Sequence, residues 1–428
     1  MARIYDAVLR FMVRCSDYAK KSGKEEMAFH IDALTKRAPS NLYEAMQTSI
    51  IYFVIQSNFD RSVPRTLGRI DSLFYPYYIN ESQENAITLA DSYIKALEAF
   101  RTHANLPFAL GGADENGKSL INDFSYILLD SYKKSRNEDL KLHILCTDDI
   151  PKNFLNLAME SVRAGNNSIV FLSDKKVTES LLKLGEAYDD AVNYHVVGCY
   201  ECGGRNELTC SCNGKVNITK AIEYALNDGF DMLTGDKIGL SLLNAPETFN
   251  EFFDEFLRQL KNLCDKAIAA TDIWESKNKM LHSAPILSVT YDSAMEKGGD
   301  IYCNNTAKYN NSSINAIGLA TATDSLYAIK KLVFDEKKLS LQELKDILIS
   351  NWADNEILRL QCKNKLPKFG NGNDDVDAIA QSTVKALSSF ISGRPNTKGG
   401  YYRLGLFSIN WRWGYGMHTA ASADGRLS

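Results

Sequence analysis

Three short apolar segments constrain the fold of this chain more than any other feature. They are PFALGG (residues 107–112), KLHILCT (141–147) and NSIVFLS (167–173). Each is bounded by Gly, Asn, Asp or Pro, which is typical of a buried strand. Stretches with helical periodicity lie between and around them. This alternation predicts an α/β architecture in which helices pack against the strands.

Helix start signals support the same architecture. In SNLYEAMQTSIIYFVIQSNF, Asn41 precedes Glu44 by three residues, the spacing of an N-cap residue and its reciprocal acid. Ser340 and Glu343 repeat this device ahead of a second apolar helix. The sequence contains no internal repeat, low-complexity tract or Pro/Gly/Ser linker. We therefore expect one domain over residues 1–428.

The composition excludes several classes of protein. The 428 residues are 45% hydrophobic, which is enough for a large core. The 49 basic and 53 acidic residues are interspersed, giving a net charge of −4, so neither a nucleic-acid surface nor a polybasic membrane patch is expected. No segment approaches the ~20 apolar residues that span a bilayer. The odd count of nine cysteines and a start without signal-peptide features predict reduced thiols and a cytoplasmic location.

Four cysteines lie within fourteen residues, at positions 199, 202, 210 and 212. Four thiolates could bind a tetrahedral zinc ion. Against zinc, the last pair runs directly into NGKVNITKAIEYALNDG, a predicted helix with Asn217 as N-cap and Gly229 as its stop signal. We therefore expect no metal site.

A redox role for the first two cysteines is also disfavoured. A redox Cys-x-x-Cys pair is expected at a helix N-terminus, but Gly203 and Gly204 follow Cys202 here. We expect Cys202, Cys210 and Cys212 to be small residues in packed loops.

Cys199 differs from its neighbours because it stands in the stretch GCYE. A thiol and a carboxylate two residues apart can face the same cavity in an extended turn, and Gly198 allows close approach of the backbone. Such a pair suits a sulfur atom that removes a hydrogen and a carboxylate, that of Glu201, that moves a proton.

GCYE resembles the cysteine loop of the glycyl radical enzymes, the pyruvate formate-lyase-like superfamily. Other stretches resemble the family in its order along almost the whole chain. They are LGRIDSLFYPYY (67–78), LGGADENGKSLINDFSYILLDS, VRAGNNSIVFLSD, SAMEKGGDIYCNNTAKYN, ATATDSLYAIKKLVFDEKKLSLQEL, LPKFGNGNDDVDAIA and the closing GGYYRLGLFSINWRWGYGMHTAASADGRLS. We expect structural roles for these, with Leu326, Ile329 and Val333 in the core of an amphipathic helix.

The resemblance implies a ten-stranded α/β barrel of two five-stranded half-barrels, surrounded by helices. Residues 1–428 would form this barrel domain, incomplete at both ends, because the family's N-terminal helical region and C-terminal glycine radical domain lie outside the chain. Gly393, in FISGRPN, precedes the ADGR stretch and is not a credible radical site. No cofactor would bind this chain directly. The glycyl radical would form on the outside domain and be installed by a radical-SAM activase.

The resemblance also assigns roles: Cys199 would form the thiyl radical and Glu201 would be the general acid/base. Tyr200 stands where pyruvate formate-lyase has a second cysteine, so a lyase or dehydratase that cleaves a C–O, C–N, C–S or C–C bond of a small molecule is expected. The alternative is a catalytically silent barrel that acts only in binding.

The identity of the substrate is left open by the sequence. Arg61 and Arg65 in DRSVPRTLGR could bind a carboxylate or sulfonate through paired hydrogen bonds, or could be surface and helix-end charges. The expected partners are the small-molecule substrate, the radical-SAM activase, a separate glycyl radical domain and a second copy in a homodimer.

Overall fold

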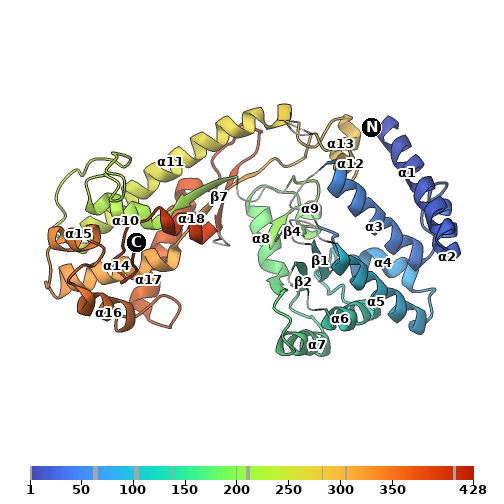
Figure 1. Ribbon diagram of the computed structural model, residues 1–428, viewed down its shortest axis with the longest axis horizontal. Coiled ribbons are helices and arrows are strands. Elements are labelled where there is room, and N and C mark those ends of the chain that lie inside the picture. Colours follow the sequence, from blue (N-terminus) through green and yellow to red (C-terminus); the bar gives the residue numbers. More distant parts are fainter. Residues whose placement is uncertain are drawn as a thin grey trace. The chain divides into compact units, whose positions relative to one another are not determined.

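The structure is a computed structural model that describes residues 2–60, 66–100, 106–135, 137, 139–198, 200–208, 213–281, 283–303, 306–407 and 411–428. The chain divides into two compact units (Figure 1). Unit 1 comprises Met1–Thr209 and Asn278–Asn310, and unit 2 comprises Cys210–Lys277 and Asn311–Ser428. The single domain over residues 1–428 stays a prediction. Among the described residues, no helix combines the length and apolarity needed to cross a bilayer.

Unit 1 contains a parallel sheet, a hairpin and the helices around them. The strands are β1 (Leu106–Gly111), β2 (Leu140–Cys146), β3 (Ile169–Ser173), β4 (His195–Val197) and β5 (Glu201–Gly203). The helices are α1 (Ala2–Lys21), α2 (Glu25–Leu34), α3 (Leu42–Phe59), α4 (Ile70–Tyr78), α5 (Gln83–Ala99), α6 (Asp123–Lys133), α7 (Lys152–Arg163), α8 (Asp174–Lys183), α9 (Tyr188–Val192), α12 (Pro285–Ser288) and α13 (Asp292–Lys297).

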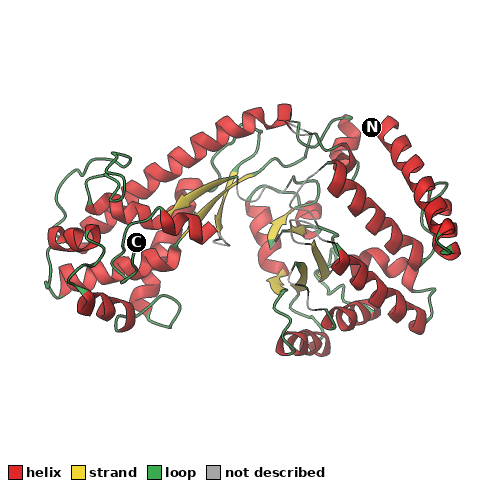
Figure 2. Ribbon diagram, in the orientation of Figure 1, coloured by secondary structure: helices red, strands yellow, loops and turns green. Residues whose placement is uncertain are grey.

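Unit 2 is built around a second parallel sheet. Its strands are β6 (Gly214–Asn217), β7 (Ser312–Ile317) and β8 (Tyr402–Leu406). Its helices are α10 (Ile218–Leu226), α11 (Phe249–Leu281, of which the residues to Lys277 belong here), α14 (Leu319–Ile329), the π-helical η1 (Lys330–Asp335), α15 (Leu341–Ile349), α16 (Glu356–Asn364), α17 (Asp374–Ile391) and α18 (Trp411–Met417). Figure 2 shows the strands of each unit among helices, which confirms the α/β class.

The predicted strands form the sheet of unit 1. Its order is β1-β2-β3 with parallel pairing, in the register Leu106↔Leu140 and Leu142↔Ile169. Every residue of β1 is buried. Apolar side chains of α3 to α7, such as Phe74 and Phe124, pack with β1 and β2 in one core. The sheet of unit 2 has the order β6-β7-β8, also parallel.

The predicted helix caps are confirmed. Asn217 accepts a hydrogen bond from the Thr219 amide at the start of α10, and Ser340 and Glu343 form a reciprocal capping box at α15. Helix α10 ends at Leu226, and Gly229 lies in the turn beyond it with φ +77°. In the predicted amphipathic helix, Leu326 and Ile329 are fully buried and Val333 packs against the core.

The side chain of Glu44 makes more hydrogen bonds than a helix-capping acid needs. Asn41 caps α3 as predicted, by accepting from the Glu44 amide. The fully buried Glu44 carboxylate accepts from Ser40 N at 2.8 Å, from both terminal nitrogens of Arg37 at 2.6 and 2.8 Å, and lies 2.9 Å from His30 Nδ1. The Arg37 guanidinium is the main cause of the lowered pKa of Glu44. The carboxylate therefore joins α2 and α3, and it accepts from Ser40 N instead of the Asn41 amide that the predicted reciprocal cap requires.

Asp71 joins α4, β1 and α6 in the core of unit 1. Its side chain is fully buried. Oδ2 accepts from Gly111 N at 2.8 Å and from Ser125 Oγ at 2.7 Å, and Oδ1 accepts from Ser72 N at 2.8 Å. Gly111, the last residue of β1, has φ +81°, where a side chain would be strained. Burial raises the pKa of Asp71 to about 6, although these hydrogen bonds oppose the shift.

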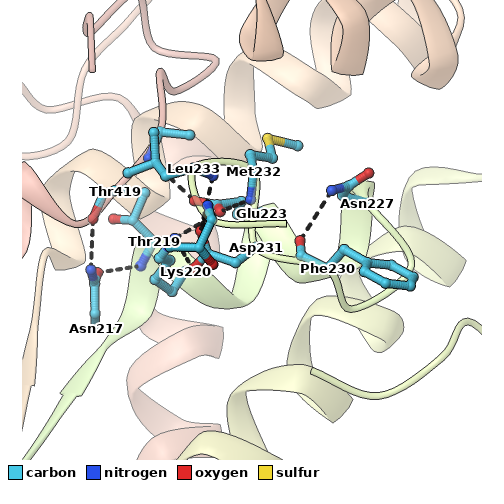
Figure 3. Close-up of polar contacts among 12 residues, drawn as sticks. Asn217, Thr219, Lys220, Glu223, Asn227, Phe230, Asp231, Met232, Leu233 and Thr419 are labelled. Carbon is cyan, nitrogen blue, oxygen red and sulfur yellow. Dashed lines mark hydrogen bonds and ion pairs between the residues drawn. The ribbon is translucent and has the colours of Figure 1, made fainter. Parts of the chain in front are cut away.

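A buried ion cluster joins three segments of unit 2 (Figure 3). Lys220 Nζ lies 2.7 Å from Glu223 Oε1 and 2.6 Å from Asp231 Oδ2, with all three side chains at most 10% exposed. Glu223 Oε1 also accepts from Met232 N at 2.7 Å, and Oε2 accepts from Ala420 N at 3.3 Å. The cluster thus holds α10, the turn after it and the segment before the chain's end.

We predict that Lys220→Met strongly destabilises the chain. The substitution keeps the side-chain length but leaves Glu223 and Asp231 buried without their cation, which costs about 3–5 kcal/mol. Lys261→Met is the matched control, because the Lys261–Asp265 ion pair is half exposed and contributes at most about 1 kcal/mol. Urea unfolding followed by circular dichroism measures both. Equal losses in the two variants would contradict the assignment.

Asp71 should make stability depend on pH. Because its folded pKa of about 6 lies above its ordinary value of 3.8, its contribution is fully present below about pH 4 and is lost as pH rises through 6. Relative to Asp71→Asn, the wild-type chain should therefore lose up to about 3 kcal/mol between pH 4 and 7. Urea unfolding of both proteins across this range measures the difference. Asp130→Asn, at an exposed position of α6, is the control and should leave the dependence of stability on pH unchanged. If the stability of Asp71→Asn changed with pH in the same way as that of the wild type, the assignment would be refuted.

Candidate active site

Three residues of the GCYE stretch, Gly198, Tyr200 and Glu201, lie at the tip of a β-hairpin in unit 1. Strands β4 and β5 pair antiparallel, with Val197 opposite Glu201. Residues 198–200 connect them, and Gly198 has φ +60°, a conformation that favours glycine. Cys199 lies outside the described residues. In the sequence, Cys199 stands between β4 and β5, whose pairing the structure describes.

The hairpin packs on the parallel sheet through one of its faces. Val196 and Cys202 are paired across the hairpin and contact a cluster that includes Ala109 of β1, Leu145 of β2 and Tyr194. Because successive side chains of a strand alternate between faces, Val197 and Glu201 point to the opposite face. The sheet thus fixes the side of the hairpin on which Glu201 stands.

The Glu201 carboxylate bends back toward the tip. Its Oε2 accepts a hydrogen bond from Tyr200 N at 3.1 Å, and Tyr200 directly follows Cys199. The Glu201 side chain is neither fully buried nor fully exposed. A carboxylate held at the tip in this way can exchange a proton with a small molecule bound beside the cysteine.

The segment after the hairpin is tightly held. Gly204 N donates to Glu207 Oε2 at 3.1 Å, and Glu207 is fully buried. A Cβ atom on Gly204 would lie 1.7 Å from Oε2 of the buried Glu186, so only glycine fits without moving that carboxylate. A side chain at position 204 would therefore displace the Glu186 carboxylate, which gives the second glycine after Cys202 a structural explanation.

An ion cluster that the sequence did not reveal fixes the same segment. The buried Asp190 carboxylate accepts from Lys308 Nζ and, at 2.7 Å, from the Tyr309 hydroxyl. The Asp190 carbonyl accepts from Arg205 N at 2.9 Å. Lys308 and Tyr309 belong to the family-like stretch YCNNTAKYN, the one signal that could have drawn attention to them.

Arg69 of the LGRID stretch holds the segment that leads into the hairpin. Its Nη2 donates to Asn193 Oδ1 at 2.9 Å. Nearby, burial raises the pKa of both Asp174 and Tyr194, each at most 3% exposed. A Cβ atom on Gly112 would lie 3.0 Å from Arg69 Nη1 and 3.3 Å from Asp174 Oδ1. The second glycine of the Gly-Gly pair thus makes room for this polar cluster.

The other predicted residues have different outcomes. Arg61, Arg65, Cys199, Cys210 and Cys212 all lie outside the described residues, so their roles stay predictions. The prediction that Cys202 lies in a loop is wrong: it lies in strand β5, although it packs against the sheet as a small side chain. Within the described part of the chain, no group of three or more His, Cys, Asp or Glu side chains could hold a metal ion. Because the cysteines at 199, 210 and 212 are not included, the expected absence of a metal site stays a prediction.

Solved structures and curated proteins resemble this chain over nearly its full length. A glycyl radical enzyme from Archaeoglobus fulgidus superposes with a TM-score of 0.89 at 22% identity, covering 99% of this chain and 58% of its own. Trans-4-hydroxy-L-proline dehydratase of Clostridioides difficile is 28% identical, over 96% of this chain and 55% of its own length. (2S)-3-sulfopropanediol dehydratase of Klebsiella oxytoca is 26% identical, over 98% and 55%.

These comparisons confirm the predicted type of fold, that of the glycyl radical enzymes. The described residues contribute three parallel strands to it in each unit, where the sequence predicts half-barrels of five. The chain spans about half the length of the curated relatives that it matches. The family model described as pyruvate formate lyase-like matches residues 2–416. This chain belongs to the pyruvate formate lyase-like family.

Proposed function

We propose that this chain is the barrel core of a glycyl radical lyase or dehydratase, in which Cys199 forms the thiyl radical and Glu201 is the general acid/base. The observation that carries the proposal is the position of Glu201. Its carboxylate is hydrogen-bonded to the backbone amide that directly follows Cys199, at the tip of a hairpin that packs on the sheet.

The chemistry follows from these two side chains. A glycyl radical installed by a radical-SAM activase would supply the oxidising equivalent, and the Cys199 thiol would give up its hydrogen atom to it. The Cys199 sulfur then removes a hydrogen atom from the substrate carbon that bears a hydroxyl, and Glu201 accepts the hydroxyl proton. The resulting ketyl-type radical anion expels the substituent on the neighbouring carbon as an anion, more readily than a neutral radical would, and Glu201 passes its proton to this leaving group. Finally, the Cys199 S–H returns its hydrogen atom to the product radical, which restores the thiyl radical.

The class of reaction is supported by the relatives and by Tyr200. Both curated relatives named above are dehydratases, so elimination of water from a small hydroxylated substrate is favoured. Tyr200 offers no second thiol for acyl transfer. Arg61 and Arg65 are proposed ligands for an anionic group of the substrate. A separate glycyl radical domain is the proposed partner of the chain as it stands.

Electron paramagnetic resonance under strict anoxia tests this function. The chain is mixed with a radical-SAM activase, a separately supplied glycyl radical domain and candidate hydroxylated substrates. We expect a glycyl doublet and substrate consumption with the wild-type chain. In Cys199→Ala the doublet should persist without turnover, and in Glu201→Gln turnover should fall about 100-fold or more, because a general acid/base contributes typically that much.

Cys202→Ala is the matched control, since this second thiol of the hairpin packs against the sheet and takes no part in the proposed chemistry. It should keep most of the turnover. Consumption of substrate by Cys199→Ala would refute the assignment of the thiyl residue. A doublet with no turnover in any of the proteins, combined with saturable binding of the same substrates, would instead support the silent barrel that acts only in binding.

A further inference from the structure

A groove of about 540 Å³ opens on unit 2. Its walls are the end of α10, the loop before α11, the end of η1 and the start of α15. The residues that line it are Ala225, Leu226, Asp228, Leu242, Ala245, Pro246, Glu247, Val333, Phe334, Lys337, Leu339, Ser340, Leu341, Gln342 and Lys345. This volume lies within the range of small-molecule sites in proteins. None of these residues takes part in the proposed chemistry.

The floor of the groove is apolar and firmly held. Leu242, Val333, Phe334 and Leu341 are each partly buried, so their remaining surface faces outward. The Phe334 ring packs edge-on against Phe249, with ring centroids 6.1 Å apart, and both rings contact the core of unit 2. A floor fixed by the core can bind an apolar group without first being ordered.

The charges at the rim are unbalanced in favour of cations. The Asp228 carboxylate is already engaged, because it accepts from Leu242 N at 2.7 Å and pairs with Lys237 at 3.1 Å. The side chains of Lys337 and Lys345 make no ion pair or hydrogen bond with any residue that the structure describes, although the charge of Lys345 helps to lower the pKa of Asp228. Glu247 is the one other acid in the lining. With Lys237 paired to Asp228, the groove and its rim therefore carry three ammonium groups, of Lys237, Lys337 and Lys345, and two carboxylates, of Asp228 and Glu247.

Lys337 stands out from the lysines around it. Lys330 and Lys331 both pair with Asp335, and Lys338 pairs with Glu336 at 2.7 Å. Lys337 alone among these four lines the groove, and it has φ +48°, an uncommon conformation for a residue with a side chain. The turn thus places Lys337 in the lining of the groove, together with Lys345 of α15.

We propose that this groove binds a small amphipathic carboxylate, whose apolar tail lies on the floor and whose carboxylate pairs with Lys337 and Lys345. An ammonium compound would meet the two lysines and is disfavoured. A neutral compound would bury its tail but gain no charge-assisted hydrogen bond. The ligand class is therefore set by the sign of the charge at the rim and by the apolar floor together.

Titration of the full chain with sodium octanoate, measured by calorimetry, tests the proposal. Saturable binding at one site is expected, with a Kd of about 1 mM or tighter for a ligand of this size. The Lys337→Met/Lys345→Met variant should weaken binding about tenfold or more, because it removes both charged donors. Lys338→Met is the matched control: it removes a neighbouring lysine that pairs with Glu336 and does not line the groove. It should bind octanoate as the wild type does.

Three outcomes would overturn the proposal. Equal binding of octylammonium or 1-octanol would show adsorption to apolar surface only. Equal weakening by Lys338→Met would show that the effect is one of net charge. A dimer in light scattering that Leu242→Glu dissociates, without octanoate binding, would show that a second copy of the chain occupies the groove. Circular dichroism melts of each variant verify that it is folded.

Discussion

The buried carboxylate of Asp71 places three segments of unit 1 that are far apart in the sequence. It receives hydrogen bonds from the start of α4, from the last residue of β1 and from α6. The position of β1 in turn fixes the surface on which the hairpin packs, because Ala109 of β1 lies in the cluster that contacts Val196 and Cys202. The candidate site therefore depends on a group that lies outside it.

Two residues before Asp71, Arg69 extends the same dependence toward the site. It is the N-cap residue of α4, and its guanidinium reaches Asn193, just before β4. One short stretch, GRID, thus supplies a buried anchor for the sheet and a surface anchor for the hairpin. A buried carboxylate is expensive to desolvate, so it persists only where several donors satisfy it. In unit 2 a buried cation is satisfied in a similar way. Lys220 is buried between the carboxylates of Glu223 and Asp231, and Glu223 also accepts a hydrogen bond from a backbone amide.

The features that the sequence predicted correctly are local ones. The caps at Asn41, Asn217 and Ser340 depend on residues two or three positions apart, and the strands depend on short apolar runs. The partners of Glu44 could not be predicted beyond Asn41, because His30 comes from α2 and Arg37 from the segment after it, and the sequence does not specify how these pack against α3. The resemblance marked Arg69 and Asp71 as part of a family-like stretch. The hydrogen bonds of Asp71, however, require β1 and α6 to be in place, and that of Arg69 requires Asn193.

The same distinction explains what was missed at the site. Asp190 meets Lys308 and Tyr309 across more than a hundred residues of sequence, so no spacing rule connects them. Their effect is to restrain the chain after Gly204, while Arg69 and Asn193 restrain it before Tyr194. The described chain is thus held by hydrogen bonds on both sides of position 199 in the sequence. If Cys199 forms a thiyl radical, such anchoring has a purpose, because hydrogen transfer requires the sulfur and the substrate carbon to be held near contact distance, and displacements of about 1 Å are costly.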